Sequence, residues 1–227
     1  MEIRLLDERS DPGILERLYD KVITPSFDPA EREPVDRLTA ALAAGELRGA
    51  VAVTPEGEEV GALFLEWFAD IRAALLCYFA VRPDLRGRGV GQRLVAVATP
   101  QWRAELRPHV VYAEAEDPRF HGGVADYGDG DARLRLYAGF GARRLAVRYF
   151  LPELMPGEGR LPDLLLLVAE ADETVRPTPG KFRGAAVADF LERYFARQEG
   201  PPRDDDPALQ SLLAECRQAE YLPLLDL

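Results

Sequence analysis

The chain has 227 residues, 47% of them hydrophobic and 30% charged, which is the composition of a globular protein rather than a disordered or collagen-like one. With 28 Lys and Arg against 39 Asp and Glu, the net charge is −11. This charge argues against nucleic-acid and anionic-membrane partners and favours a cationic small molecule or a basic peptide. Two cysteines and two histidines without metal-site spacing exclude a disulfide framework and argue against a metal.

The first hundred residues predict two helices and a meander of strands. A strand is expected over Glu2–Leu6 and a helix after Asp11-Pro12, followed by an exposed loop that carries Phe27 and a second helix that begins at Pro34. Three strand-like runs follow, at Leu47–Thr54, Glu59–Trp67 and Arg72–Val81. A helix after these strands has apolar residues on one face, namely Val90, Leu94, Val97 and Ala98.

The second half predicts further strands and then helices. Strands are expected over His109–Glu116, near Ala142–Leu151 and near Asp163–Glu170, with a short helix around Ala132–Ala138. Two more helices are expected after a proline-rich linker, from Ala186 to Gln198 and from Asp206 onward. The N-terminus lacks a signal-peptide core, and no run reaches 18 apolar residues, so a cytoplasmic protein is expected.

The strongest motif is a glycine-rich loop between a strand and a helix. An apolar strand ends at Val81, and the run Arg86-Gly87-Arg88-Gly89-Val90-Gly91 leads into the next helix. Glycines permit a close backbone approach, and the first amides of a helix have no internal partner. The junction therefore predicts a phosphate or pyrophosphate site, to which the two arginines add positive charge.

Three phosphate-binding patterns compete for this loop. A Walker A loop would need Gly-Lys-Ser/Thr, whereas Gly91 is followed by Gln92 and Arg93. A dinucleotide fingerprint would need a glycine at position 92. The third pattern, Arg-x-x-Gly-x-Gly, is satisfied by Arg86, Gly89 and Gly91. The segment thus resembles the acetyl-CoA-binding segment of the GNAT N-acetyltransferase superfamily.

A second segment is similar to the same superfamily. Tyr137 stands on an expected short helix, four residues before Gly141, while Ala142 departs from the family's usual phenylalanine. The resemblance implies a mixed α/β (α+β) fold with a mostly antiparallel central sheet flanked by helices, in an acetyltransferase domain over residues 1–171. The proline-rich stretch and the amphipathic pattern after it predict a linker and a C-terminal helical extension over residues 172–227, which pack on the domain or on a partner subunit in a homodimer.

The resemblance also implies direct transfer of acetyl from acetyl-CoA, as co-substrate, to a primary amine in a ternary complex. Tyr137 matches the general acid that protonates the departing sulfur, although a packed helix tyrosine stays open as an alternative. The residues implied in binding the co-substrate are Phe79, Val81, Arg86, Gly87, Arg88, Gly89, Val90 and Gly91.

The base is less defined, because the fourth strand holds no carboxylate. Glu114 and Glu116 alternate along one expected strand and so share a face, where two like charges raise at least one pKa. Glu114 resembles the base of the ribosomal-protein alanine acetyltransferases, and Glu66 is a third candidate. Each of the three could instead be a solvated surface glutamate.

The long loop over Asp117–Asp131 carries four aspartates. We interpret it as lying on the substrate side, with a merely mobile excursion as the alternative. The sequence predicts an enzyme whose acceptor is a cationic small-molecule or peptide amine. A non-catalytic acyl-CoA-binding module that acts through a protein partner is the alternative function, which Tyr137 and the acidic strand disfavour.

Overall fold

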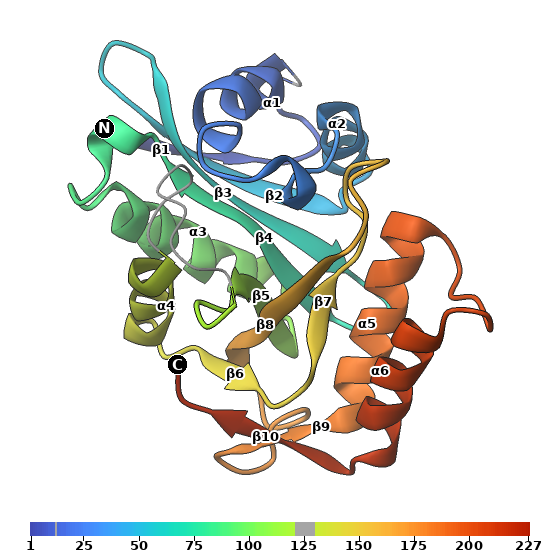
Figure 1. Cartoon of the computed structure of the whole chain (residues 1–227). Coiled ribbons are helices and arrows are strands. Elements are labelled where there is room, and N and C mark those ends of the chain that lie inside the picture. Colours follow the sequence, from blue (N-terminus) through green and yellow to red (C-terminus); the bar gives the residue numbers. More distant parts are fainter. Residues whose placement is uncertain (12, 121–129) are drawn as a thin grey trace.

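A computed structural model of the chain describes residues 1–11, 13–120 and 130–227 (Figure 1). These residues form one open sheet of ten strands in the order β1-β2-β3-β4-β5-β8-β6-β10-β9, with β7 paired to β8. The strands are β1 (Glu2–Leu6), β2 (Leu47–Val53), β3 (Glu59–Phe68), β4 (Ala73–Val81), β5 (Val110–Glu116), β6 (Arg143–Leu145), β7 (Tyr149–Leu151), β8 (Leu161–Ala171), β9 (Lys181–Arg183) and β10 (Tyr221–Leu225). Within the described residues every paired couple is antiparallel except β4 with β5, so the expected mixed sheet is confirmed.

Six α-helices cover the two faces of the described sheet (Figure 1). They are α1 (Gly13–Leu18), α2 (Val35–Ala43), α3 (Val90–Leu106), α4 (Gly130–Gly139), α5 (Gly184–Glu199) and α6 (Pro207–Gln218). Apolar side chains of α1 and α2 pack on β2, β3 and β4, and those of α5 and α6 pack on β4, β5 and β8. The helices α3 and α4 pack on the opposite face. The sheet therefore separates an α1/α2/α5/α6 side from an α3/α4 side.

A bulge in β4 breaks the alternation of its side chains. The register of β3 and β4 pairs Phe64 with Tyr78 and Leu65 with Leu76, so Cys77 is the extra residue on β4. As a result Tyr78 packs on the α1/α2 side, while Phe79 joins Leu76 on the α3 side. Cys77 itself is half-buried and lines a pocket.

Two expectations about exposure are wrong. Phe27 was expected in an exposed loop, but its ring is 9% exposed and packs edge-on against Tyr78 with a centroid distance of 5.2 Å. Val97 was expected on the buried face of α3, but it is 36% exposed, whereas Val90, Leu94 and Ala98 are buried. The single strand expected near Ala142–Leu151 is two short strands, β6 and β7.

The C-terminal residues contribute to the sheet as well as to the helical layer. β10 pairs with β6 and with β9, which extends the sheet beyond β8. The start of α5 lies very close to the end of α6. A Cβ at Gly184 would lie only 2.2 Å from the carbonyl oxygens of Cys216 and Ala219, so only glycine fits there. Stacking of Phe190 on Tyr112, with ring centroids 4.2 Å apart, fixes α5 over β5.

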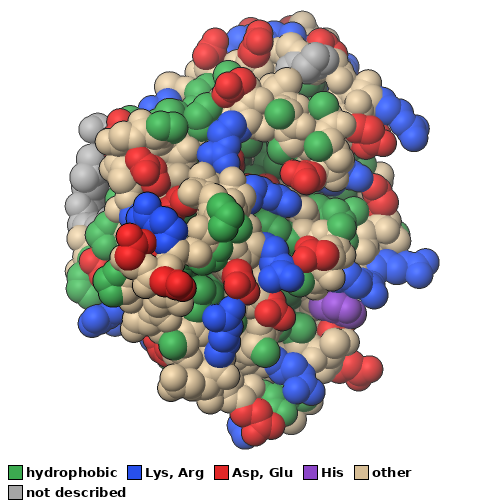
Figure 2. Space-filling view, turned by 90° about the vertical axis from the view of Figure 1, so that its right-hand side faces the viewer, with side chains coloured by type: hydrophobic (Ala, Val, Ile, Leu, Met, Phe, Trp, Pro, Cys, Tyr) green, Lys and Arg blue, Asp and Glu red, His purple; other side chains and the backbone are tan. Residues whose placement is uncertain are grey.

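Figure 2 shows the face on which α5 and α6 lie. Acidic and basic side chains are interspersed there, and two of the ion pairs join Arg193 to Asp70 and Arg217 to Glu192. The negative net charge is therefore not gathered into one patch on this face. Among the helices of the described residues, none is both long and apolar enough to cross a membrane.

Candidate functional site

The site forms where the parallel strands β4 and β5 separate. They pair only from Ala73 to Leu76 on β4 and from Val110 to Ala113 on β5. Beyond this point the bulge at Cys77 redirects β4, and β5 continues its pairing with β8 alone. The separated ends of the two strands leave an opening through the sheet, and pockets lie on both sides of it.

The glycine-rich loop forms one wall of a cleft of about 450 Å³, which we call the cofactor cleft. Gly87 and Gly89 have φ values of +74° and +79°, a region that residues with a Cβ rarely adopt. Gly89 is the N-cap of α3, and no side chain caps this helix end, so its first amides face the cleft. A Cβ at Gly91 would lie 2.9 Å from the ring of Phe79. The loop thus offers backbone donors and a helix N-terminus to an anion.

The predicted cofactor residues lie at this cleft with one exception. The cleft is lined by Phe79, Val81, Arg86, Gly87, Gly89, Val90 and Gly91, whereas Arg88 is exposed and is not among the lining residues. Arg86 donates to the carbonyl of Val81 at 3.0 Å and to the hydroxyl of Ser26 at 3.0 Å.

A second cationic residue lines the cofactor cleft. Arg133, on α4, faces it together with Arg86. Burial and the neighbouring charge of Arg133 lower the pKa of Arg86. An anion bound between the two guanidinium groups would relieve their repulsion. This arrangement fits a pyrophosphate or phosphate group.

An acidic pocket opens on the α1/α2/α5 side of the same gap. Its charged lining residues are Glu31, Glu33, Glu114 and Arg133. Tyr137, Leu76 and Phe79 line it as well, although Tyr137 comes from α4 on the opposite side of the sheet. The Tyr137 side chain therefore bridges the gap, and the cofactor cleft and the acidic pocket share Phe79.

Glu114 is the carboxylate of β5 that enters the acidic pocket. It accepts hydrogen bonds from the hydroxyls of Tyr149 and Tyr194, the latter at 3.3 Å. Burial, together with the charges of Glu66 and Glu31, raises the pKa of Glu114 to about 8, and the hydrogen bonds from the two tyrosines partly oppose this rise. A carboxylate with such a pKa can take up a proton near neutral pH.

The other two predicted carboxylates lie outside this pocket. Glu66 is 3% exposed and forms a 3.1 Å ion pair with Arg197 of α5. Burial and the charge of Glu33 raise the pKa of Glu66 to about 8. Glu116 is half-buried and lies 3.9 Å from the guanidinium of Arg133. Glu114 and Glu116 share a face of β5, as expected, but the three glutamates do not meet at one point.

The Tyr137 side chain is buried, with 6% of the residue exposed, and it lines the acidic pocket at the gap. Burial raises the pKa of its hydroxyl to about 12, and the charge of Arg133 partly opposes this effect. The hydroxyl therefore keeps its proton at physiological pH and can donate it or a hydrogen bond.

Sequence analysis missed the glutamates of the loop before α2. The backbone amide of Glu33 donates to the Tyr78 hydroxyl at 2.8 Å, which fixes this loop against β4. Gln198 of α5 donates to the Glu33 carboxylate at 3.2 Å. Asp28 and Glu31 form a capping box around the short helix Pro29–Glu31, and this spacing was the available sequence signal.

Part of the acidic loop cannot be placed at the site. Residues 121–129 lie outside the described residues, so the interpretation of Asp117–Asp131 as a substrate-side loop stays a prediction. Asp117 itself pairs with Arg119, which lowers the pKa of the carboxyl. Among the described residues, no group of three or more His, Cys, Asp and Glu side chains could hold a metal ion.

Comparison with known proteins agrees with this geometry. Residues 4–121 match the model of the acetyltransferase (GNAT) family. A putative GNAT-family acetyltransferase from Bacteroides thetaiotaomicron aligns over 86% of this chain and 99% of its own, with a TM-score of 0.58 and 18% identity, which shows a common fold. A variant of the spermidine N-acetyltransferase SpeG from Vibrio cholerae aligns over 74% and 94%, with a TM-score of 0.49 and 17% identity. No curated protein sequence matches the chain significantly.

Proposed function

The chain belongs to the GNAT acetyltransferase family, and from this membership we propose that it transfers acetyl from acetyl-CoA directly to a primary amine in a ternary complex. The observation that carries the proposal is the meeting of two sites at one gap in the sheet. The cofactor cleft and the acidic pocket adjoin at this gap, and Phe27, Phe79 and Arg133 line both of them. A thioester in this gap would stand within reach of an amine, so no covalent enzyme intermediate is needed.

In this proposal the chain's own residues divide the work of binding and proton transfer. The amides of residues 86–91 and the guanidinium of Arg133 hold the pyrophosphate. Acetyl-CoA supplies the activated acyl group. Glu114 takes one proton from the ammonium, which frees the nitrogen lone pair for attack.

Proton balance assigns a role to Tyr137. An ammonium that becomes an amide loses two protons, and the departing thiolate needs one. Glu114 receives the first proton and later releases it to solvent. The Tyr137 hydroxyl donates a proton to the departing sulfur, and the second proton of the ammonium balances this loss. Because the pKa of Glu114 is raised, it lies closer to the pKa of an alkyl ammonium. Transfer of the first proton from the ammonium to Glu114 is therefore easier.

We expect acetyl-CoA to stabilise the fold through the glycine-rich loop. At about 100 times its dissociation constant it should raise the melting temperature by roughly 5–10 °C. Gly89→Asp should abolish this shift, because the new carboxylate would stand at an uncapped helix N-terminus where the pyrophosphate binds. Differential scanning fluorimetry measures the effect.

The matched control for this experiment is Gly157→Asp. Gly157 has a comparable φ of +92°, and nothing lies within 4 Å of its would-be Cβ. This variant should keep the full acetyl-CoA shift. An equal shift in Gly89→Asp and in the wild type would refute the assignment of the loop.

The acidic pocket restricts the shape of the amine. It offers about 40 Å³, against about 450 Å³ in the cofactor cleft. The ammonium end of an acceptor can enter, whereas the rest of a longer acceptor must extend outward. The glutamates that line the pocket stabilise a positive charge there. An unbranched, positively charged primary amine fits these conditions.

We therefore expect diamines and lysine-like amines to be acetylated in preference to amines branched at the carbon next to nitrogen. Added salt should raise the KM of a cationic acceptor several-fold, because the Debye length falls from about 10 Å at 0.1 M to about 3 Å at 1 M. Thiol release measured over an amine panel at both ionic strengths tests this. Preference for a neutral or anionic acceptor with a salt-independent KM would contradict the charge assignment.

A further inference from the structure

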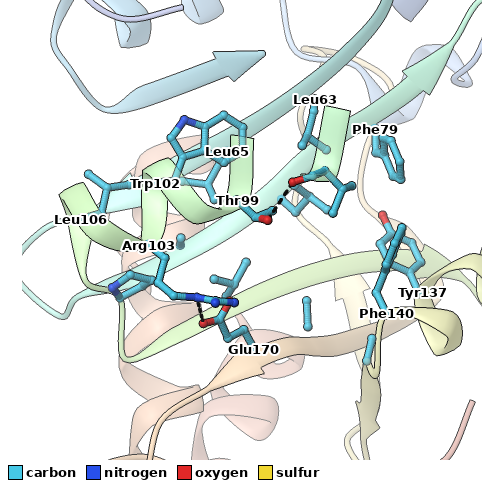
Figure 3. Close-up of a pocket in the computed structure, with 17 residues that line it drawn as sticks. Leu63, Leu65, Phe79, Thr99, Trp102, Arg103, Leu106, Tyr137, Phe140 and Glu170 are labelled. Carbon is cyan, nitrogen blue, oxygen red and sulfur yellow. Dashed lines mark hydrogen bonds and ion pairs between the residues drawn. The ribbon is translucent and has the colours of Figure 1, made fainter. Parts of the chain in front are cut away.

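An apolar cavity lies on the α3/α4 side of the sheet, next to the gap between β4 and β5 (Figure 3). It has a volume of about 230 Å³, several times that of the acidic pocket. Apolar side chains of β3, β4 and α3 form most of its wall, among them Leu63, Leu65 and Trp102, and Phe140 contributes from the turn after α4. Apolar cavities of about 150 Å³ stay dry and bind a molecule the size of benzene, so this one has room for about six carbons.

Small residues leave this space open. Ala142 is 3% exposed and lines the cavity with its methyl group, and Ala74 and Ala169 also line it. A larger apolar side chain at any of these positions would fill part of the volume. The alanine at position 142, where the sequence departs from the usual phenylalanine, therefore has a structural consequence.

Besides the Tyr137 hydroxyl at the gap, the wall carries the polar side chains of Thr99, Arg103 and Glu170, which are paired or lie at the rim. The Thr99 hydroxyl donates to the carbonyl of Val95 at 2.8 Å. Arg103 and Glu170 form an ion pair of 2.6 Å at the rim, and their side chains are 62% and 38% exposed. A polar ligand would thus find few partners inside, whereas a hydrocarbon chain has no hydrogen bonds to give up on entry.

The position of the cavity relates it to the thioester. Leu76, Phe79 and Tyr137 line both the cavity and the acidic pocket, and Phe79 also lines the cofactor cleft. Figure 3 shows Phe79 and Tyr137 together at one side of the cavity, with Trp102 and Leu106 at the other. A chain attached to a carbonyl carbon beside Tyr137 could therefore extend into the cavity while the amine approaches from the acidic pocket.

We propose that this cavity binds the acyl chain of the co-substrate, and that it accepts saturated chains of about four to six carbons in addition to acetyl. The inference rests on the proposed acyl transfer and concerns the donor alone. The transfer is unchanged in its chemistry: the thioester C–S bond breaks, the amide C–N bond forms, and the sulfur leaves as the thiol of CoA. One proton of the ammonium goes through Glu114 to solvent, and the other balances the proton that the sulfur receives.

Isothermal titration calorimetry of the whole chain with CoA, acetyl-CoA, butyryl-CoA, hexanoyl-CoA and dodecanoyl-CoA tests the proposal by affinity alone. Each methylene buried in the cavity should tighten binding by about threefold to fourfold. Hexanoyl-CoA has four more methylenes than acetyl-CoA and should therefore bind about 80-fold more tightly or better. The gain should end near six carbons, so dodecanoyl-CoA should bind no more tightly than hexanoyl-CoA.

A matched pair of variants on α3 places the effect in the cavity. Val95 lines the cavity, whereas Val97 is exposed on the same helix and does not. Val95→Phe should reduce the affinity for hexanoyl-CoA to that for acetyl-CoA and leave CoA binding unchanged. Val97→Phe should behave as the wild type. Ala142→Phe is a second, independent way to fill the cavity, and unchanged CoA binding shows that each variant is folded.

The failure of this inference differs from the failure of the proposed function. Equal affinity for acetyl-CoA and hexanoyl-CoA overturns the inference, even if acetyl-CoA is turned over with an amine. The inference is also overturned if Val95→Phe weakens the binding of CoA and of every thioester equally, because the pantetheine arm would then occupy the cavity. If hexanoyl-CoA binds more tightly but no amine causes release of free CoA, the cavity assignment is supported and the proposed transfer is refuted.

Discussion

Tyr137→Phe should lower kcat by about 10²–10⁴-fold while the dissociation constant of acetyl-CoA changes little. The ring keeps its packing in α4, and only the hydroxyl at the gap is lost. Burial raises the pKa of that hydroxyl to about 12, so it is a proton donor throughout the accessible pH range. Steady-state kinetics with calorimetry of acetyl-CoA binding separates the two effects.

The control for this variant is Tyr221→Phe. Tyr221 is half-buried on β10, with Lys181 and Arg183 near its ring, and it lines neither the cofactor cleft nor the acidic pocket. Its kcat should equal that of the wild type. A near-normal kcat in Tyr137→Phe would mean that this tyrosine only packs the helix, or that water protonates the thiolate.

Glu114→Gln should lower kcat by about 10²–10⁴-fold and remove the acidic limb of its pH profile. In the wild type the rate should rise with pH and level off above about 8, because Glu114 accepts a proton only when ionised and its pKa is about 8. The amide keeps the shape of the side chain but cannot accept a proton. A pH–rate series from pH 6 to pH 10, at roughly half-unit steps, resolves the limb.

Two further variants identify the group that produces this limb. Glu116→Gln, on the same face of β5 but outside the acidic pocket, should keep the limb in place. Tyr194→Phe should move it to higher pH, because the hydrogen bond from Tyr194 lowers the pKa of Glu114. An unshifted limb in Glu114→Gln would assign the base to another residue.

Local sequence patterns were sufficient where neighbouring residues determine the structure. β1 was predicted residue for residue, and the runs predicted at Leu47–Thr54 and Glu59–Trp67 are the antiparallel pair β2 and β3. β9 and β10 escaped prediction because β9 has three residues and β10 contains Pro223, which argues against a strand. β10 forms because β6 and β9 offer their edges, which is tertiary information.

The site shows the same division. The glycine-rich loop could be located because its residues are adjacent in sequence, and the structure places most of them at one cleft. The acidic pocket could not be located from the sequence. Glu33, Glu114 and Tyr194 come together only because the loop before α2 and the helix α5 both pack on the sheet. For the same reason the ion pair of Glu66 with Arg197, which spans 131 positions, has no sequence signature.

The most direct test of the proposed activity is incubation of the wild-type chain with acetyl-CoA and an unbranched diamine, with thiol release and the mass of the amine followed together. We expect free CoA to appear only when the amine is present, in an amount equal to that of the monoacetylated amine. Tyr137→Phe and Glu114→Gln should suppress both products. Binding of acetyl-CoA with no release of free CoA in the presence of any amine would contradict the proposed transfer and favour a non-catalytic acyl-CoA-binding module.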